Sequence, residues 1–334
     1  MADKQVGNIE AIALILTVMI NHIILNLPKN IIATTSSGSL LNVIFISLVA
    51  LGVVYLICHL LKKFPGLDIL DIAKYLGGKW LKILIGVLLI AYLVFTISTL
   101  LRSFSEGLKI IFFPRTPVPI IMLLFLIAII IGNKLGFQSI VRSNLFFMPV
   151  ILISILFIFL ANIENFSMYR ISPILGDGVI PTFFSGLSNL FAFGGITYLY
   201  LIPPHLKDQK GYQKVAYASI GISAFYLFIS VATLLFLFPL VTTSEEVFPL
   251  YLASRYIEFG RFFQRLDALF LLIWIVSVIS YLNIAFFFTT SIFQKLTNMQ
   301  YTKWFIALFG AITFGISLLP ENLQQIGFLE NNIY

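Results

Sequence analysis

Long apolar runs separated by short polar segments dominate the pattern of hydrophobic and polar positions along this chain. A helix that crosses a membrane needs about 20 mostly apolar residues. Nine runs approach or exceed this length: residues 9–34, 39–61, 80–104, 117–133, 140–161, 181–204, 213–240, 263–292 and 303–320. The pattern therefore predicts an all-α polytopic membrane protein with nine visible spans.

One polar segment between the runs has a different pattern. Residues 67–81 place Asp68, Asp71, Lys74 and Lys79 among apolar residues, which is typical of an amphipathic helix in the membrane interface. The composition agrees with a membrane protein, because 60% of the 334 residues are hydrophobic and only 10% are charged. A soluble domain usually carries about 25% charged residues.

The positive charge of the chain is distributed unevenly between the two predicted faces. The net charge of +7 would suggest nucleic acid for a soluble protein, but here the excess lies mostly in short loops between apolar runs. Of the 21 lysines and arginines, 13 fall on one predicted face and 8 on the other. Cytoplasmic loops carry the excess, so we expect a cytoplasmic N-terminus and the lipid bilayer, not nucleic acid, as the partner.

The sixth run contains an interruption at mid-depth. Its stretch NLFAFGGITYLYLIPPHL carries Gly194 and Gly195 at the centre and two prolines that begin at Pro203. Non-helical backbone at membrane depth is tolerated only where it is buried in protein or lines a cavity. The interruption therefore favours a binding site, although a glycine pair can also simply allow two helices to pack closely.

The first run has a similar interruption. It places Asn21, His22 and Asn26 among apolar residues, and Pro28 follows them. Five spans in each half, an odd number, would invert the second half relative to the first. Matching breaks in the two halves of an inverted repeat are a sequence pointer to a transporter-type binding site.

These features predict a single transmembrane domain over residues 1–334. Its first repeat covers about residues 9–161, and an inverted second repeat covers about residues 181–334. A five-plus-five repeat requires a tenth span. The C-terminal segment ENLQQIGFLENNIY looks like the approach to that helix, so we expect the second repeat to be incomplete, with its tenth span missing or truncated.

Four segments of the sequence resemble a known family. They are NLPKNI at the end of the first run, AKYLGGKWLKIL before and within the third, FGGITYLYLIPPH in the sixth and QRLDALFLLIWIVSV at the start of the eighth. In this order and spacing they resemble the B subunit of spore-germination nutrient receptors, an endospore germination permease family within the amino acid–polyamine–organocation transporter superfamily. The resemblance extends over about residues 5–330.

This resemblance implies a fold like that of the leucine transporter, with ten helices in a five-plus-five inverted repeat. It implies a place in the inner membrane of a bacterial endospore, a receptor A subunit and a lipoprotein C subunit as partners, and a small germinant, typically an amino acid, as ligand. The N-terminus would then face the spore core. One departure lies in the first span, where family members usually have a glycine-bearing break and this chain has Asn21-His22-Ile23-Ile24.

A zwitterionic amino acid needs donors for its carboxylate and acceptors for its ammonium group, and interrupted helices supply both from the backbone. Further side chains share single helical faces on the third and eighth spans, where packing or hydrogen bonding within the bundle is the alternative role. The candidate ligand-binding residues are Asn21, His22, Asn26, Tyr92, Phe95, Thr96, Phe193, Gly194, Gly195, Ile196, Thr197, Ser277 and Ser280.

Two functions remain open from the sequence. One is a receptor subunit that binds a germinant at the membrane midplane and signals to its partners. The other is a secondary amino acid transporter coupled to protons or sodium. The runs carry no clear mid-depth Asp or Glu for ion coupling, which favours the receptor. We expect no cofactor and no metal site, because the three histidines lack ligand spacing, and we expect no enzyme, because catalytic motifs are missing.

Overall fold

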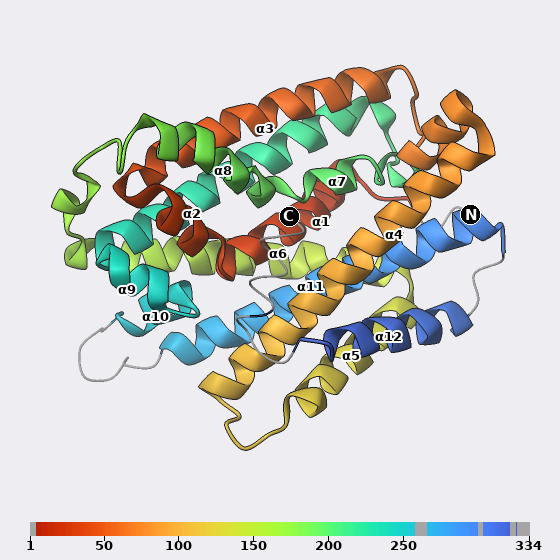
Figure 1. Ribbon diagram of the computed structural model, residues 1–334. Helices are drawn as coiled ribbons and strands as arrows, with labels where there is room; N and C mark the ends of the chain where they lie inside the picture. The colour runs from red at the N-terminus through yellow and green to blue at the C-terminus, as the bar shows by residue number, and fades with distance from the viewer. Residues whose placement is uncertain (1–4, 258–265, 300–302, 321–324, 326–334) are drawn as a thin grey trace.

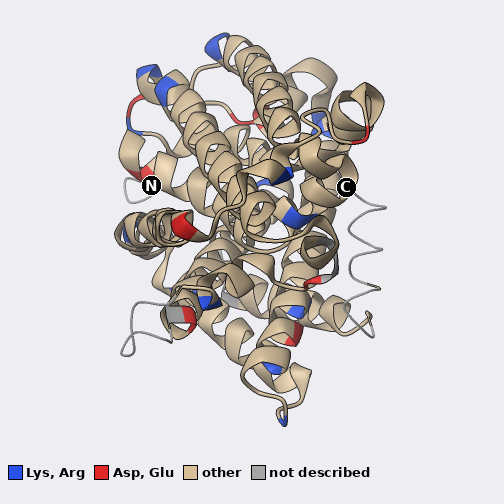
Figure 2. Cartoon of the chain, turned by 90° about the vertical axis from the view of Figure 1, so that its left-hand side faces the viewer, with Lys and Arg blue, Asp and Glu red and all other residues tan. Residues whose placement is uncertain are grey.

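The computed structural model describes residues 5–257, 266–299 and 303–320 and residue 325, and its regular elements over these ranges are helices (Figure 1). Within these described ranges, six helices are long and apolar enough to cross a membrane, and three shorter apolar helices accompany them. The predicted all-α class is confirmed, whereas the number of nine spans stays a prediction. Most of the chain carries no charge (Figure 2), as expected for helices that face lipid or one another.

The first half of the chain forms one broken helix, four long ones and three short 3₁₀ turns. These elements are α1 (Asn8–Ile24), α2 (Leu27–Thr35), η2 (Ser36–Gly38), α3 (Ser39–Lys62), α4 (Ile69–Ile111), α5 (Val118–Leu135), α6 (Phe137–Ala161), η3 (Ile163–Asn165) and η4 (Met168–Ile171). The first predicted span therefore corresponds to two helices, α1 and α2.

The second half begins with irregular helix and continues with long α-helices. A π-helical turn, η5 (Ile180–Phe184), leads into a 3₁₀ segment, η6 (Ser185–Phe193), at the place of the sixth predicted span. The remaining elements are α7 (Ile196–Leu199), η7 (Pro203–His205), η8 (Gln209–Gly211), α8 (Tyr212–Leu237), α9 (Leu240–Glu245), α10 (Pro249–Arg255), α11 (Leu266–Thr297) and α12 (Lys303–Ser317). Most of the C-terminal segment, where a tenth helix was expected to begin, lies outside the described residues.

The predicted interfacial segment is continuous with the third span. Asp68 caps α4, because its carboxylate accepts the Asp71 backbone N–H at 3.0 Å. The helix then bends at Gly77 and Gly78, where Gly78 has a φ of 70° that favours glycine. The short helix before this bend is thus joined to a long helix after it.

The two interrupted spans lie against one another at the centre of the molecule. α1 is almost wholly buried and packs on α6, α8 and α11, and it also touches η6 and α7. α4 crosses beside α11 and α12 (Figure 1). The two elements on either side of the sixth-span break, η6 and α7, therefore both contact α1.

Candidate functional site

The break in the first span lies farther along the chain than Asn21 and His22. α1 continues as a regular helix through Asn21 and His22 and ends at Ile24. Leu25 and Asn26 then connect it to α2, where Pro28 occupies the first turn. Proline is tolerated there because the first N–H groups of a helix have no partner within it.

The break in the sixth span lies at the predicted glycine pair, but glycine is not required there for conformational reasons. Gly194 and Gly195 have φ values of −55° and −59°, which any residue adopts. A β-carbon on Gly195 would lie 2.6 Å from Met19 Cγ, whereas one on Gly194 would lie 3.4 Å from the Tyr92 hydroxyl. Close helix packing therefore accounts for Gly195, and Gly194 leaves space beside Tyr92.

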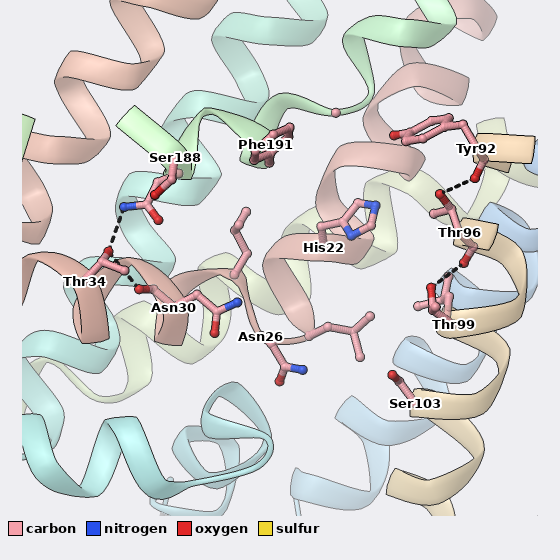
Figure 3. Close-up of a pocket in the computed structure, with 15 residues that line it drawn as sticks. His22, Asn26, Asn30, Thr34, Tyr92, Thr96, Thr99, Ser103, Ser188 and Phe191 are labelled. Atoms are coloured by element: carbon pink, nitrogen blue, oxygen red, sulfur yellow. Dashed lines mark hydrogen bonds between the residues drawn. The ribbon is translucent and has the colours of Figure 1, made fainter. Parts of the chain in front are cut away.

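A pocket of about 420 Å³ lies between the two breaks and α4 (Figure 3). This volume is within the range of small-molecule sites, roughly 300–1,000 Å³. The lining residues are His22, Leu25, Asn26, Leu27, Asn30, Thr34, Tyr92, Thr96, Thr99, Leu100, Ser103, Ser188, Asn189, Phe191 and Gly194. Five of the sequence candidates, His22, Asn26, Tyr92, Thr96 and Gly194, are thus brought together.

The lining of the pocket combines apolar and polar side chains and carries no Asp, Glu, Lys or Arg among the described residues. Amides and hydroxyls provide its hydrogen-bonding groups. The Asn26 Oδ1 atom is buried and has no hydrogen-bond partner in the described part of the chain. Such an atom is costly unless a ligand or water donates a hydrogen bond to it, so the pocket suits an uncharged or zwitterionic polar solute.

One face of α4 forms a row of hydroxyl groups along the pocket (Figure 3). Tyr92, Thr96, Thr99 and Ser103 are spaced i, i+4, i+7 and i+11, so they share a helical face. The Thr96 hydroxyl donates to the Tyr92 carbonyl at 2.8 Å, and the Thr99 hydroxyl donates to the Thr96 carbonyl at 3.2 Å. Extending the same spacing past Thr96 in the sequence would have found Thr99 and Ser103.

The opposite wall is held by side-chain amides. Asn189 Nδ2 donates to Thr34 Oγ1 at 2.9 Å and to Asn42 Oδ1 at 3.0 Å. Asn42 Nδ2 in turn donates to the Thr182 carbonyl at 2.8 Å and the Gly186 carbonyl at 3.0 Å. These bonds hold the π and 3₁₀ segments against α3. No pattern in the sequence pointed to Asn42 and Asn189, because π and 3₁₀ winding changes which residues share a helical face.

The other sequence candidates lie outside the pocket lining. Asn21 Nδ2 donates to Ser277 Oγ at 2.8 Å, and both side chains are fully buried between α1 and α11. Thr197 lies next to the pocket and is hydrogen-bonded to the Tyr92 side chain. The candidates that do not line the pocket are Asn21, Phe95, Phe193, Gly195, Ile196, Thr197, Ser277 and Ser280.

The N-terminal segment is hydrogen-bonded to the segment that follows α7. The Val6 N–H donates to the His205 carbonyl at 2.7 Å, and the Lys207 N–H donates to the Val6 carbonyl at 3.0 Å. The pocket instead extends along α2 to Thr34 and along α4 to Ser103, away from this segment. It therefore lies toward the end of the molecule opposite to the N-terminus.

An ion-pair cluster joins the start of α4 to the end of α11. The Lys295 ammonium donates to Asp68 Oδ2 at 2.6 Å and also to Asp71. Burial raises the pKa of the Asp68 carboxyl, and the Lys295 charge opposes this shift. Over the described residues, no group of three or more His, Cys, Asp or Glu is placed to hold a metal ion.

Solved structures share this arrangement of helices. A Na⁺-coupled sialic acid symporter in a substrate-bound, outward-open state matches with a TM-score of 0.70 and 12% identity over 98% of this chain and 77% of that one. Mhp1, a nucleobase-cation-symport-1 family transporter in a closed conformation with bromovinylhydantoin bound, matches with a TM-score of 0.70 and 13% identity over 98% and 75%. The chain is thus a multi-pass membrane protein with the predicted leucine-transporter-like fold.

The family is also established by sequence. A family profile described as Spore germination protein matches residues 5–326, so the chain belongs to the spore germination permease family. Spore germination protein A2 of Bacillus subtilis (strain 168) is 24% identical over 98% of this chain and 91% of its own length. Spore germination protein B2 of the same organism is 23% identical over 97% and 89%. Family and fold are those of permeases and transporters rather than enzymes.

Proposed function

We propose that this chain is the membrane subunit of a spore germinant receptor and binds a small nutrient, an amino acid, in the pocket between its two interrupted spans. The observation that carries the proposal is the break at Leu25 and Asn26, which opens into a cavity and leaves Asn26 Oδ1 without a partner among the described residues. Membership of the germination family supplies the biological context.

The electrostatics of the break support an amino acid as ligand. The C-terminal end of α1 presents carbonyl groups, and the N-terminal end of α2 presents N–H groups, at the same edge of the pocket. A helix carries partial negative charge at its C-terminus and partial positive charge at its N-terminus. An ammonium and a carboxylate group complement these two ends without a charged side chain.

The proposed receptor includes further subunits. In this proposal a receptor A subunit and a lipoprotein C subunit act with the chain in the inner membrane of the endospore, with the N-terminus on the core side. Ligand binding then changes the population of two conformations, and the partners respond to that change. A ligand can do this without being transported, provided that it binds one conformation better.

A germination assay tests the proposal directly. Spores that lack their own receptors would express the chain with its A and C partners and receive single proteinogenic amino acids, with loss of optical density as the readout. Thr96→Leu and Gly194→Leu should raise the half-maximal concentration of the active amino acid by roughly tenfold or more, since about 1.4 kcal/mol is tenfold in affinity.

Matched control variants make that result specific to the pocket. Thr297 donates to its own helix as Thr96 does but is exposed. A β-carbon placed on Gly52 would meet no heavy atom within 4 Å. Thr297→Leu and Gly52→Leu should therefore respond like the wild type. Unchanged responses in both pocket variants at normal protein level would remove this site as the ligand site.

The second candidate function is a secondary amino acid transporter. The observation in its favour is that the two solved structures with this fold are a Na⁺-coupled symporter and a cation-symport family transporter. Proteoliposomes containing the purified chain would be supplied with a radiolabelled form of the active amino acid under a sodium or a proton gradient. Gradient-driven accumulation supports the transporter, whereas a germination response without accumulation supports the receptor.

A further inference from the structure

Four lysines gather where α3 ends and α4 begins. Lys62 is the last residue of α3 and Lys63 follows it, while Lys74 and Lys79 stand on either side of the bend in α4. All four are exposed, and none forms an ion pair with another described residue. We call these four residues the lysine collar.

Nearby carboxylates do not neutralise the lysine collar. Between Lys62 and Lys79 the sequence contains only two acidic residues, Asp68 and Asp71. Both are already bonded to Lys295 from α11. The collar therefore keeps its positive charge and has no acidic partner on its own segment.

The collar is held together by the fold. The Phe64 and Tyr75 rings meet edge to face with centroids 5.7 Å apart, so the end of α3 is folded against the short helix before the bend. This contact brings Lys62 and Lys63 to the same part of the surface as Lys74. The upper right of Figure 1 shows the loop that joins α3 to the start of α4.

Exposed aromatic side chains lie next to the collar. Trp80 is 85% exposed and Tyr75 is 76% exposed, which is unusual for large aromatic residues in a packed bundle. Beyond Trp80, the exposed side chains of Leu84 and Leu88 continue along the same face of α4, so this face meets lipid. Tryptophan and tyrosine at the end of such a face mark the level of the lipid headgroups.

The exposed residues of α3 follow the same order along the helix as those of α4. Its exposed apolar side chains include Leu48 and Leu56, and Tyr55 at 60% exposure lies near their end. Lys62 and Lys63 come after them at the end of the helix. On both helices the order is apolar face, aromatic residue and lysine, which is the order of acyl chain, interface and headgroup in a bilayer.

We propose that the lysine collar, with Tyr75 and Trp80, binds the headgroups of anionic phospholipids in the leaflet that surrounds the inner ends of α3 and α4. Basic residues at the membrane surface attract anionic lipids, and the flanking aromatic rings set their depth. The binding site is separate from the pocket between the two breaks.

The position of the collar gives lipid binding a structural consequence. The short helix that carries Lys74 also holds α11 through Lys295, and the Ile69 N–H donates to the Tyr200 carbonyl after α7 at 3.1 Å. Anionic lipid at the collar thus binds to the element that joins the inner ends of the third, sixth and eighth spans.

Fluorescence quenching by brominated lipids tests this proposal on the full chain. The protein has three tryptophans, of which Trp274 is 1% exposed and Trp304 is 80% exposed. In a Trp304→Phe background reconstituted in bilayers, quenching by lipid therefore reports mainly on Trp80. The probes are brominated phosphatidylglycerol and brominated phosphatidylcholine at increasing mole fraction.

The expected result is a preference of about threefold or more for phosphatidylglycerol at Trp80, since each lysine near the surface attracts anionic lipid. Replacing the four collar lysines with glutamine should abolish the preference while quenching by brominated phosphatidylcholine stays unchanged, which shows that the protein is folded and Trp80 still meets lipid. Replacing them with arginine should keep the preference, because the charge is kept.

A charge-matched control separates the collar from a general effect of positive charge. Lys134, Arg142, Arg115 and Arg255 are exposed on other parts of the chain, and changing all four to glutamine removes the same charge. This variant should retain the preference for phosphatidylglycerol. Equal quenching by both lipids in the parent protein, or equal loss of preference in the control, would overturn the proposal and leave the collar to an acidic protein partner.

Discussion

Alanine substitutions at the two neighbouring glycines of the sixth span should have different effects. A β-carbon on Gly195 would lie 2.6 Å from Cγ and 3.0 Å from Cε of Met19, and 3.4 Å from Cγ1 of Val18. Met19 is fully buried in α1, so it has little space into which to move. A β-carbon on Gly194 would meet Phe191 O at 3.2 Å and the Tyr92 hydroxyl at 3.4 Å, beside the open pocket.

The magnitude for Gly195→Ala follows from overpacking. Extra volume in a well-packed core typically costs about 1–3 kcal/mol. At about 2.1 cal/mol/K of unfolding entropy per residue, the 334-residue chain changes stability by roughly 0.7 kcal/mol per degree. The midpoint of thermal unfolding should therefore fall by roughly 1–4 °C for Gly195→Ala and remain near the wild-type value for Gly194→Ala.

The assay measures both proteins in the same detergent by intrinsic fluorescence during heating, and germination is measured in parallel. Gly194→Ala should change the concentration dependence of germination at normal protein level, because it narrows the pocket beside Tyr92. Wild-type stability of Gly195→Ala, or an equal loss of stability in the two variants, would refute this reasoning.

Three further substitutions test contacts on which the architecture depends. Ser277→Ala removes the hydroxyl that accepts a hydrogen bond from Asn21 Nδ2, so it should lower the free energy of unfolding by about 1–2 kcal/mol. The measurement is the midpoint of thermal unfolding, and an unchanged midpoint would mean that Asn21 finds another partner. Lys295→Met leaves the Asp68 and Asp71 carboxylates without their cation and should speed proteolysis near the start of α4. The effect should be modest, because the lysine side chain is 31% exposed and water screens the ion pairs. A wild-type rate of proteolysis would contradict a structural role for the cluster. Asn42→Ala removes two donated hydrogen bonds and one accepted hydrogen bond, so it should lower the free energy of unfolding by about 2–3 kcal/mol. Hydrogen exchange should then increase in η6 relative to α8, and an equal increase in both elements would contradict local anchoring of η6 by Asn42.

The sequence was sufficient for the membrane character and the approximate helix positions. Long apolar runs can satisfy their backbone in lipid only as helices, so composition and periodicity decide the class of fold almost alone. Gly194 and Gly195 also located the second break correctly, since the 3₁₀ segment ends there and prolines follow soon after. The resemblance of four short segments indicated the family that the profile match then confirmed.

The tertiary structure decided which side chains face the pocket. Asn21 and His22 are neighbours on α1, yet Asn21 points to Ser277 on α11 and His22 lines the cavity. Adjacent residues on a helix lie about 100° apart, and the sequence does not say which direction faces which neighbour. The same limit applies to Asn189 in η6, because its place in the wall depends on 3₁₀ winding and on the amide of Asn42.

What the sequence by itself determined was therefore a set of apolar helices, their two interruptions and a net positive charge. What only the tertiary structure decided was the contact of distant groups: the row of hydroxyls on α4 facing the first break, and the lysine collar left without carboxylates because Lys295 binds them. The physical reason is that helix formation depends on local hydrogen bonds and burial, whereas a site depends on the rotation of each helix against its neighbours.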